Sequence, residues 1–193
     1  MKKVLLALAA VVLFATTSNA QSSYFDFNLG YSQDNTLDED YDLQIKNLSI
    51  GYNTLIANDL YLGASIGYSM VGADNDNNEV NIFTLTPRVT YQRNLAGGFY
   101  WTPSFYVTAG YGQHDLGTAF GVDLGSMNYL NFRIGANLLS FDYKFSKNFA
   151  INLNVLTPYY NIMKVSYSEN ENFEGDYDGF VYLGGSLGVK FSL

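Results

Sequence analysis

The amino-acid sequence predicts an all-β protein, an antiparallel up-and-down barrel of about eight strands. Two observations carry this prediction. Apolar and polar residues alternate in eight segments, and the side chains of a strand point alternately to opposite faces. The connections between these segments are alternately short and long, as expected for a barrel built from successive hairpins.

The N-terminus has the three parts of a secretory signal peptide. Lys2 and Lys3 supply positive charge, Val4–Ala15 is apolar, and Ser18-Asn19-Ala20 offers the small residues that a signal peptidase reads. The apolar run is shorter than the roughly 20 residues of a spanning helix. We therefore expect residues 1–20 to be a cleaved signal peptide and residues 21–193 to be a single barrel domain, exported through the general secretory route.

The composition excludes several classes of protein. The chain has no cysteine, so no disulfide framework holds it together, while its 17 Tyr, 14 Phe and 18 Gly favour β-structure. Loss of Lys2 and Lys3 takes the formal net charge from −8 to −10. This sign disfavours nucleic-acid binding, which needs basic surfaces.

Each alternating segment is long enough, with its flanking residues, to supply a tilted strand of about 9–11 residues that crosses a membrane. Two places break the alternation, at Lys46–Leu48 and at Leu138–Leu139, and predict β-bulges. The eight segments are Ser23–Gln33, Leu48–Asn53, Leu62–Met70, Phe83–Tyr91, Trp101–Tyr111, Leu130–Leu138, Phe149–Val155 and Val181–Leu193.

The connections predict which end of the barrel faces which compartment. Short turns of outer-membrane barrels face the periplasm, and long loops face the outside. Both termini should then be periplasmic. The short connections are Thr54–Asp59, Gln92–Gly98 and Phe145–Asn148, and the long ones are Asp34–Asp42, Ala73–Glu79, Gln113–Gly125 and Leu156–Asp178.

Alternation alone does not distinguish a membrane barrel from a soluble one. The apolar faces carry about five large side chains per strand, whereas the interior of an eight-stranded barrel is only just wide enough for side chains to fill. The face rich in Gly, Ser, Thr and Asn therefore belongs inside. Aromatic residues near the ends of the apolar faces fit the two membrane–water interfaces, and the sequence predicts a transmembrane barrel.

The last segment resembles the C-terminal assembly signal of the small eight-stranded bacterial outer-membrane β-barrels, the OmpA transmembrane-domain, OmpX and OmpW type. Its apolar residues recur at every second position, at Val189, Phe191 and Leu193, although the family usually ends in Phe. The resemblance implies a monomer in the outer membrane of a Gram-negative cell, in contact with lipid, lipopolysaccharide and the assembly machinery. It does not imply a particular function.

Acidic residues gather in the long connections. They form either a merely solvated loop surface or a surface that meets lipopolysaccharide through divalent cations, or an extracellular protein. Asp74, Asp76, Asn78 and Glu79 resemble part of a calcium loop but lack its Gly and final Glu, so they are weak metal candidates. Fifteen of the 18 acids lie there: Asp34, Asp38, Glu39, Asp40, Asp42, Asp74, Asp76, Glu79, Asp115, Asp123, Glu169, Glu171, Glu174, Asp176 and Asp178.

The predicted interior holds a small set of charges, Asp26, Lys46, Arg88, Arg133 and Lys190. Buried charges need partners. Asp26 and Lys190 lie at matching depths of the first and last strands, so we expect an ion pair between them. Tyr residues on the same face, Tyr24, Tyr61, Tyr100, Tyr106 and Tyr182, would help to fill the lumen.

We expect no catalytic activity and no cofactor. The one histidine, His114, lies at the expected start of a loop without a spaced Ser partner, and two Gly-x-Ser-x-Gly strings, at 63–67 and 184–188, fall inside strands. The sequence therefore predicts a structural or surface-interaction barrel with acidic extracellular loops and a plugged lumen. The alternative is a narrow channel or transporter for small or apolar solutes.

Overall fold

The computed structural model describes residues 23–34, 43–73, 80–115, 118–119, 122–123, 125–167, 174–181 and 183–193. The predicted signal peptide, residues 1–20, lies outside the described residues. So do the weak metal candidates Asp74, Asp76, Asn78 and Glu79. None of the described residues belongs to a helix long and apolar enough to cross a membrane.

The described chain is built from 15 strands. They are β1 (Ser23–Asp34), β2 (Leu43–Ala57), β3 (Leu60–Ala73), β4 (Val80–Tyr91), β5 (Arg93–Ala96), β6 (Phe99–Trp101), β7 (Ser104–Asp115), β8 (Thr118–Ala119), β9 (Val122–Asp123), β10 (Ser126–Asn137), β11 (Leu139–Lys144), β12 (Phe149–Leu156), β13 (Tyr159–Tyr167), β14 (Glu174–Val181) and β15 (Leu183–Ser192).

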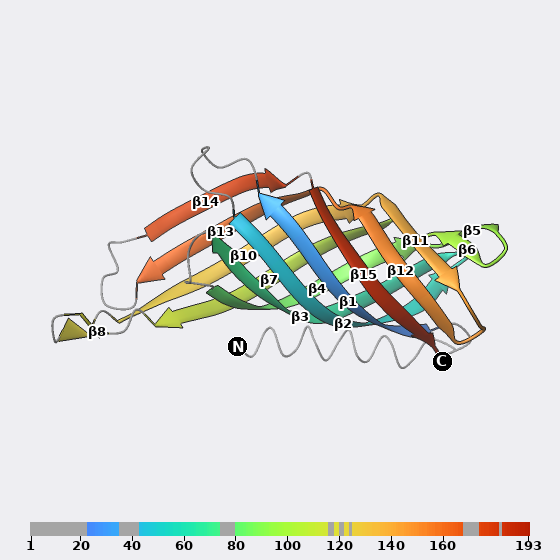
Figure 1. The fold of residues 1–193 in the computed structure, drawn as a ribbon, viewed down its shortest axis with the longest axis horizontal. Coiled ribbons are helices and arrows are strands. Elements are labelled where there is room, and N and C mark those ends of the chain that lie inside the picture. Colours follow the sequence, from blue (N-terminus) through green and yellow to red (C-terminus); the bar gives the residue numbers. More distant parts are fainter. Residues whose placement is uncertain are drawn as a thin grey trace.

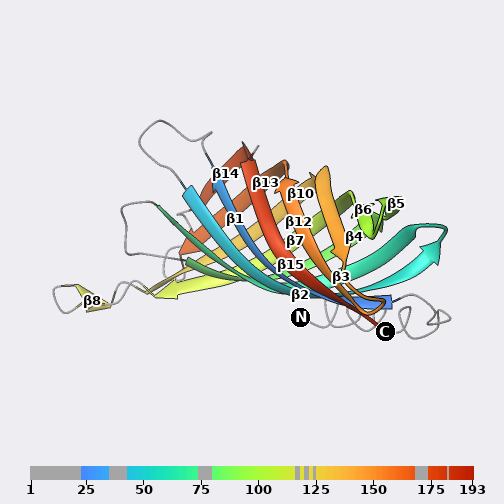
Figure 2. The same cartoon turned by 45° about the vertical axis from the view of Figure 1, so that its right-hand side comes forward.

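Thirteen of these strands form one antiparallel sheet in the order β14-β13-β10-β7-β4-β3-β2-β1-β15-β12-β11-β6-β5. β1 pairs with β2 on one side and with β15 on the other. β14 stands at one end of this order and continues into β15 with only residue 182 between them. Because β15 pairs with β1, the sheet closes on itself. The tilted strands curl around an interior in both views (Figure 1, Figure 2).

This architecture confirms the predicted antiparallel all-β class, but the number of strands exceeds the expected eight. The reason is that five stretches of chain are interrupted, around Gln92, Thr102–Pro103, Leu138, Thr157–Pro158 and residue 182, and that β8 and β9 form a separate two-stranded sheet. Proline has no N–H to donate to a ladder, which accounts for the breaks at Pro103 and Pro158. Two consecutive strands therefore form one interrupted strand in each of these cases: β4–β5, β6–β7, β10–β11, β12–β13 and β14–β15.

The two ends of the barrel differ. β2–β3, β5–β6 and β11–β12 are joined by residues 58–59, 97–98 and 145–148 at what we call the short-turn end. The N–H of Leu193 donates to the carbonyl of Ser23 there (2.9 Å). The opposite, long-loop end holds the strand ends that are joined through residues 35–42, 74–79, 116–125 and 168–173.

The side chains confirm the predicted inside and outside. Along β1, Asp26, Asn28 and Ser32 are buried, whereas Phe27 and Leu29 are exposed. The same alternation holds along β7 and β10. Polar residues therefore line the interior and large apolar residues cover the outer wall, the reverse of a water-soluble protein.

One of the two predicted bulges is confirmed and the other is wrong. Leu138 and Leu139 are both exposed on the outer wall, and the register shifts between Leu139 and Ser140. At Lys46–Leu48 the register runs without a shift against both neighbours. Ile45 takes the inward position instead and is buried, so β2 keeps its phase by accepting an apolar residue in the interior.

The fourth predicted loop, Leu156–Asp178, is largely strand. β13 lies within it, β14 begins within it, and the two strands pair with each other from Tyr159–Val181 to Ser166–Glu174. Only about 9–11 residues of a strand cross the membrane. The parts of β13 and β14 beyond that length do not contact lipid and so need no continuous apolar face. Their weak alternation explains why the sequence suggested a loop.

Aromatic pairs lie on the outer wall near the short-turn end. Phe149 packs against Phe191 with ring centroids 5.4 Å apart, and Phe25 packs against Tyr52 at 5.2 Å. Trp101 packs edge-on against Tyr91, and its Nε1 donates to the carbonyl of Leu138 (3.0 Å). Rings with one polar atom suit the boundary between hydrocarbon and water.

Candidate functional site

The barrel interior gathers the buried polar side chains of the described chain. Alternate residues of most strands point there, and the structure places Asp26, Arg88, Arg133 and Lys190 in it, as predicted. A cavity of about 150 Å³ lies among them, lined chiefly by Ser, Thr, Asn and Tyr side chains. Charged and polar groups occupy the interior near the short-turn end. An apolar layer, described below, lies toward the long-loop end.

The first charge cluster surrounds Asp26 of β1, whose side chain is 1% exposed. Its carboxylate accepts hydrogen bonds from Asn28 Nδ2 and Asn53 Nδ2, both at 2.6 Å. Arg88 of β4 forms an ion pair with the same carboxylate, and Arg88 Nε donates to Asn53 Oδ1 (2.9 Å). The buried pair is thus satisfied by one amide of β1 and one of β2, and a buried charge requires such partners.

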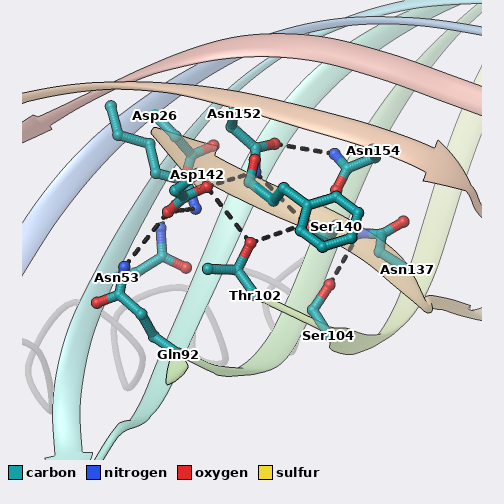
Figure 3. Close-up of polar contacts among 12 residues, drawn as sticks. Asp26, Asn53, Gln92, Thr102, Ser104, Asn137, Ser140, Asp142, Asn152 and Asn154 are labelled. Carbon is teal, nitrogen blue, oxygen red and sulfur yellow. Dashed lines mark hydrogen bonds and ion pairs between the residues drawn. The ribbon is translucent and has the colours of Figure 1, made fainter. Parts of the chain in front are cut away.

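The second cluster surrounds Asp142 of β11, which is fully buried. Lys190 Nζ of β15 lies 2.8 Å from Asp142 Oδ2. Asn152 Nδ2 donates to Asp142 Oδ1 at 2.6 Å, and Thr102 Oγ1 donates to the same atom at 3.3 Å. Figure 3 shows Asp142 at the centre of this network, with side chains converging on it from several strands.

The predicted Asp26–Lys190 ion pair is wrong in its partners. The two residues do face each other across the β1–β15 ladder, and both side chains are buried. Each nevertheless has another partner, because Arg88 reaches Asp26 from β4 and Asp142 reaches Lys190 from β11. Lys190 also lies over the ring of Tyr24, 4.9 Å from its centroid.

Asp142 was not among the residues predicted from the sequence. A signal existed: beyond the bulge at Leu138–Leu139, Ser140 and Asp142 alternate with Phe141 and Tyr143 in the same inward phase as the rest of the barrel. The predicted sixth segment ended at Leu138, so these later residues were not assigned to a face.

Lys46 does not belong to the interior. It is exposed and lies on the outer side of β2, in phase with Leu48 and Ile50. The prediction placed Lys46 inside because it assumed a bulge before Leu48. With no bulge, the inward position belongs to Ile45, and Lys46 sits near the long-loop end, four residues into the strand.

Arg133 of β10 occupies the middle of the interior, between the charge clusters and the long-loop end. Its Nε donates to Asn161 Oδ1 (3.2 Å), an atom that also accepts from Asn131 Nδ2 (2.6 Å). The guanidinium carbon lies 5.6 Å from the centroid of the Tyr159 ring. No acidic residue of the described chain lies against it.

An apolar layer closes the interior toward the long-loop end, which the sequence did not lead us to expect. Ile45 and Ile82 are each the third residue of a strand that begins at this end. Ile82 is fully buried, and the members come from β2, β3, β4, β10 and β13, most of the way around the barrel. The layer consists of Ile45, Val71, Ile82, Tyr129, Tyr159 and Met163.

The remaining predicted residues lie on the wall or at strand ends. Phe191 and Leu193 are exposed at the short-turn end, in phase with Val189. His114 lies in β7 opposite Met127, one residue before the strand ends, and not in a loop. Tyr24 and Tyr61 are buried inside, Tyr100 and Tyr106 are partly buried, and Tyr182 lies outside the described residues.

Comparison with solved structures agrees with this arrangement. The chain is similar to the crystal structure of Neisserial surface protein A, with a TM-score of 0.52, 13% identity and coverage of 89% of this chain and 97% of that one. The present chain has the fold of an outer-membrane β-barrel. A major outer membrane protein from Thermus thermophilus is similar at a TM-score of 0.50 and 11% identity, with 89% and 99% coverage.

At these identities the likeness concerns the fold alone. No protein-family model matches the sequence, and no curated protein matches it.

Proposed function

We propose that this protein is an outer-membrane barrel of the small eight-stranded type with a structural or surface-interaction role. The outer wall carries the proposal: Leu29, Ile66 and Phe83 are 64%, 60% and 69% exposed, while the interior buries charges. Soluble proteins rarely expose contiguous apolar surface of more than a few hundred Å². A lipid environment removes this cost because hydrocarbon replaces water on the wall.

The acidic long-loop end would be the interacting surface. Asp34 and Asp115 are the last residues of β1 and β7, and Glu174 begins β14, so described acids lie where strands emerge at this end. Such a rim would meet lipopolysaccharide phosphates through bridging divalent cations, or a basic protein surface. In this role the protein needs neither catalysis nor a cofactor.

As part of this proposal, the lumen of the barrel does not conduct ions. The apolar layer supports this part of the proposal because packed aliphatic and aromatic side chains interrupt a continuous water-filled path through the barrel. In a planar bilayer the protein should show no steady conductance, whereas a variant with Ile45→Ser and Ile82→Ser should open. Steady conductance of the unaltered protein would contradict a plugged lumen.

One observation favours the alternative, a narrow path for small or apolar solutes. The β12–β15 ladder ends at Asn154–Ser186, and the β13–β14 ladder begins at Tyr159–Val181. A groove on the outer wall at this level and the interior cavity share four lining residues, Tyr31, Asn154, Gly185 and Ser186. The wall is therefore thin here, and a solute dissolved in the membrane would have a short path inward.

Uptake by protein-containing vesicles distinguishes the two roles. If the path operates, a lipophilic dye should enter faster with the unaltered protein than with Gly185→Leu, because the new side chain would fill the groove. Ala96→Leu, at an exposed position at the other end of the barrel, provides the control. Equal uptake by all three proteins would favour the interaction role.

Location and surface exposure test the main proposal in cells. The protein should fractionate with the outer membrane, shift in mobility when heated in detergent, and begin at Gln21 when its mature N-terminus is sequenced. Neutralising the acidic residues Asp38, Glu39 and Asp40 should weaken binding of intact cells to divalent cations or to a basic partner. A protein found in the soluble fraction would refute the proposal.

A further inference from the structure

One buried cation of the interior has no counter-ion among the residues that the structure describes. Arg133 is 7% exposed, and its Nη2 atom is buried without a hydrogen-bond partner in the described part of the chain. Its Nε bond to Asn161 is to a neutral amide, and Tyr159 offers only the face of its ring. An uncompensated buried charge is costly, because the protein interior solvates ions much less well than water.

The other buried charges do not compensate for it. Asp26 is paired with Arg88, and Asp142 is paired with Lys190. These two pairs are neutral as units, and amides and hydroxyls already fill much of the coordination of both carboxylates. The described interior is therefore left with one net positive charge, and that charge resides on Arg133.

Arg133 also borders free space. It lines the interior cavity of about 150 Å³ together with Ser104, Tyr106 and Thr108. The side chains of Ser, Thr and Tyr can all donate hydrogen bonds. Since one water occupies about 30 Å³ in the liquid, the cavity can hold an ion of a few heavy atoms. The space is thus positive, rich in donors and small.

We propose that Arg133 anchors a binding site for one small monovalent anion, either a halide or a carboxylate of about the size of acetate. A single negative charge balances the interior, whereas a doubly charged phosphate would leave it negative. The guanidinium binds carboxylates through paired N–H donors, and those of Arg133 form no ion pair among the described residues. The site is independent of the proposed role at the cell surface.

Anion-dependent stability of the protein, purified in detergent, tests the proposal. A ligand that binds only the folded state raises its stability as ligand concentration increases. The urea midpoint is measured while chloride or acetate replaces gluconate at constant ionic strength. Urea carries no anion, and gluconate is much bulkier than chloride or acetate. We expect a saturable rise with chloride, with acetate or with both, which separates the two kinds of anion.

Two variants locate the effect at Arg133. Arg133→Gln removes the charge, and its apparent anion affinity should fall at least tenfold. Asn161→Asp keeps the Oδ1 acceptor that serves Asn131 and Arg133 but supplies an internal counter-ion. It should lose the anion dependence while its midpoint in gluconate equals or exceeds that of the unaltered protein. This second variant keeps the test valid if Arg133→Gln folds poorly.

The control is Arg93→Gln, because Arg93 is exposed near the short-turn end, and this variant should retain the full anion response. Saturation-transfer NMR should show magnetisation passing from the protein to the acetate methyl group only when acetate raises the midpoint. No saturable rise with either anion would mean that water alone solvates Arg133. An equal rise in Arg133→Gln would place the anion elsewhere. Either result overturns the proposal.

Discussion

Asp26 and Lys190 face each other across the β1–β15 ladder, yet each forms its ion pair with a residue of a third strand. Asp26 pairs with Arg88 of β4, and Lys190 pairs with Asp142 of β11. The strands that close the barrel are therefore tied to strands on either side of the junction, and not only to each other. This cross-bracing links β1 to β4 and β15 to β11 in the short-turn half of the interior.

Double-mutant cycles should detect this pattern of pairing. Cycles between Asp26→Asn and Arg88→Gln should give a coupling free energy within the range of about 0.5–3 kcal/mol seen for residues in contact. The cycle between Asp26→Asn and Lys190→Gln should give a smaller coupling, measured by urea unfolding in detergent. A larger coupling for the second cycle would mean that the carboxylate serves Lys190 after all.

Loss of Asp142 should strongly destabilise the barrel. In Asp142→Asn the buried Lys190 keeps its charge but loses its counter-ion, which typically costs about 3–5 kcal/mol. The urea midpoint should fall accordingly. Asp59→Asn makes the same chemical change at an exposed turn residue with φ of 59°, a conformation that Asn adopts readily. That control should unfold at almost the original midpoint.

A charged residue on the outer wall should destabilise the barrel more when it lies deeper in the membrane. Ile66 lies midway along β3 and Leu95 lies beside the turn at residues 97–98, and both are exposed on the wall. In lipid vesicles Ile66→Arg should cost about 2–4 kcal/mol and Leu95→Arg about 0–1 kcal/mol. Folding titrations in vesicles measure both values. Equal and negligible costs would show that water, and not hydrocarbon, surrounds the wall.

Close packing beneath the apolar layer makes Gly112 difficult to replace. A Cβ atom there would meet the backbone carbonyl oxygen of Asn81 and lie 3.0 Å from Ile82 Cγ1. Because backbone cannot move as easily as a side-chain tip, Gly112→Ala should cost about 1–3 kcal/mol. Gly185→Ala, whose Cβ would meet only the carbonyl oxygen of Asn154 at 3.1 Å, should be milder. Urea midpoints of the two variants provide the comparison.

Sequence alternation was sufficient for the fold class and for the two faces of the wall. A period of two assigns each residue to a face without knowledge of its neighbours, so Phe27 and Leu29 could be placed outside and Asp26 and Asn28 inside. The same rule failed where its phase was misjudged. Lys46 was misplaced because Ile45 occupies the inward position, and β13 was missed because its mixed residues give no clear apolar face.

Partner choice within the barrel was decided only by the tertiary structure. Alternation places Asp26, Arg88, Arg133, Asp142 and Lys190 on one surface, but the curvature, tilt and stagger of the strands determine which charged groups come within contact distance. Alternation alone predicts a barrel with a polar interior and an apolar wall. The folded arrangement shows two ion pairs near the short-turn end and an apolar layer toward the long-loop end, with Arg133 between them and without a counter-ion among the described residues.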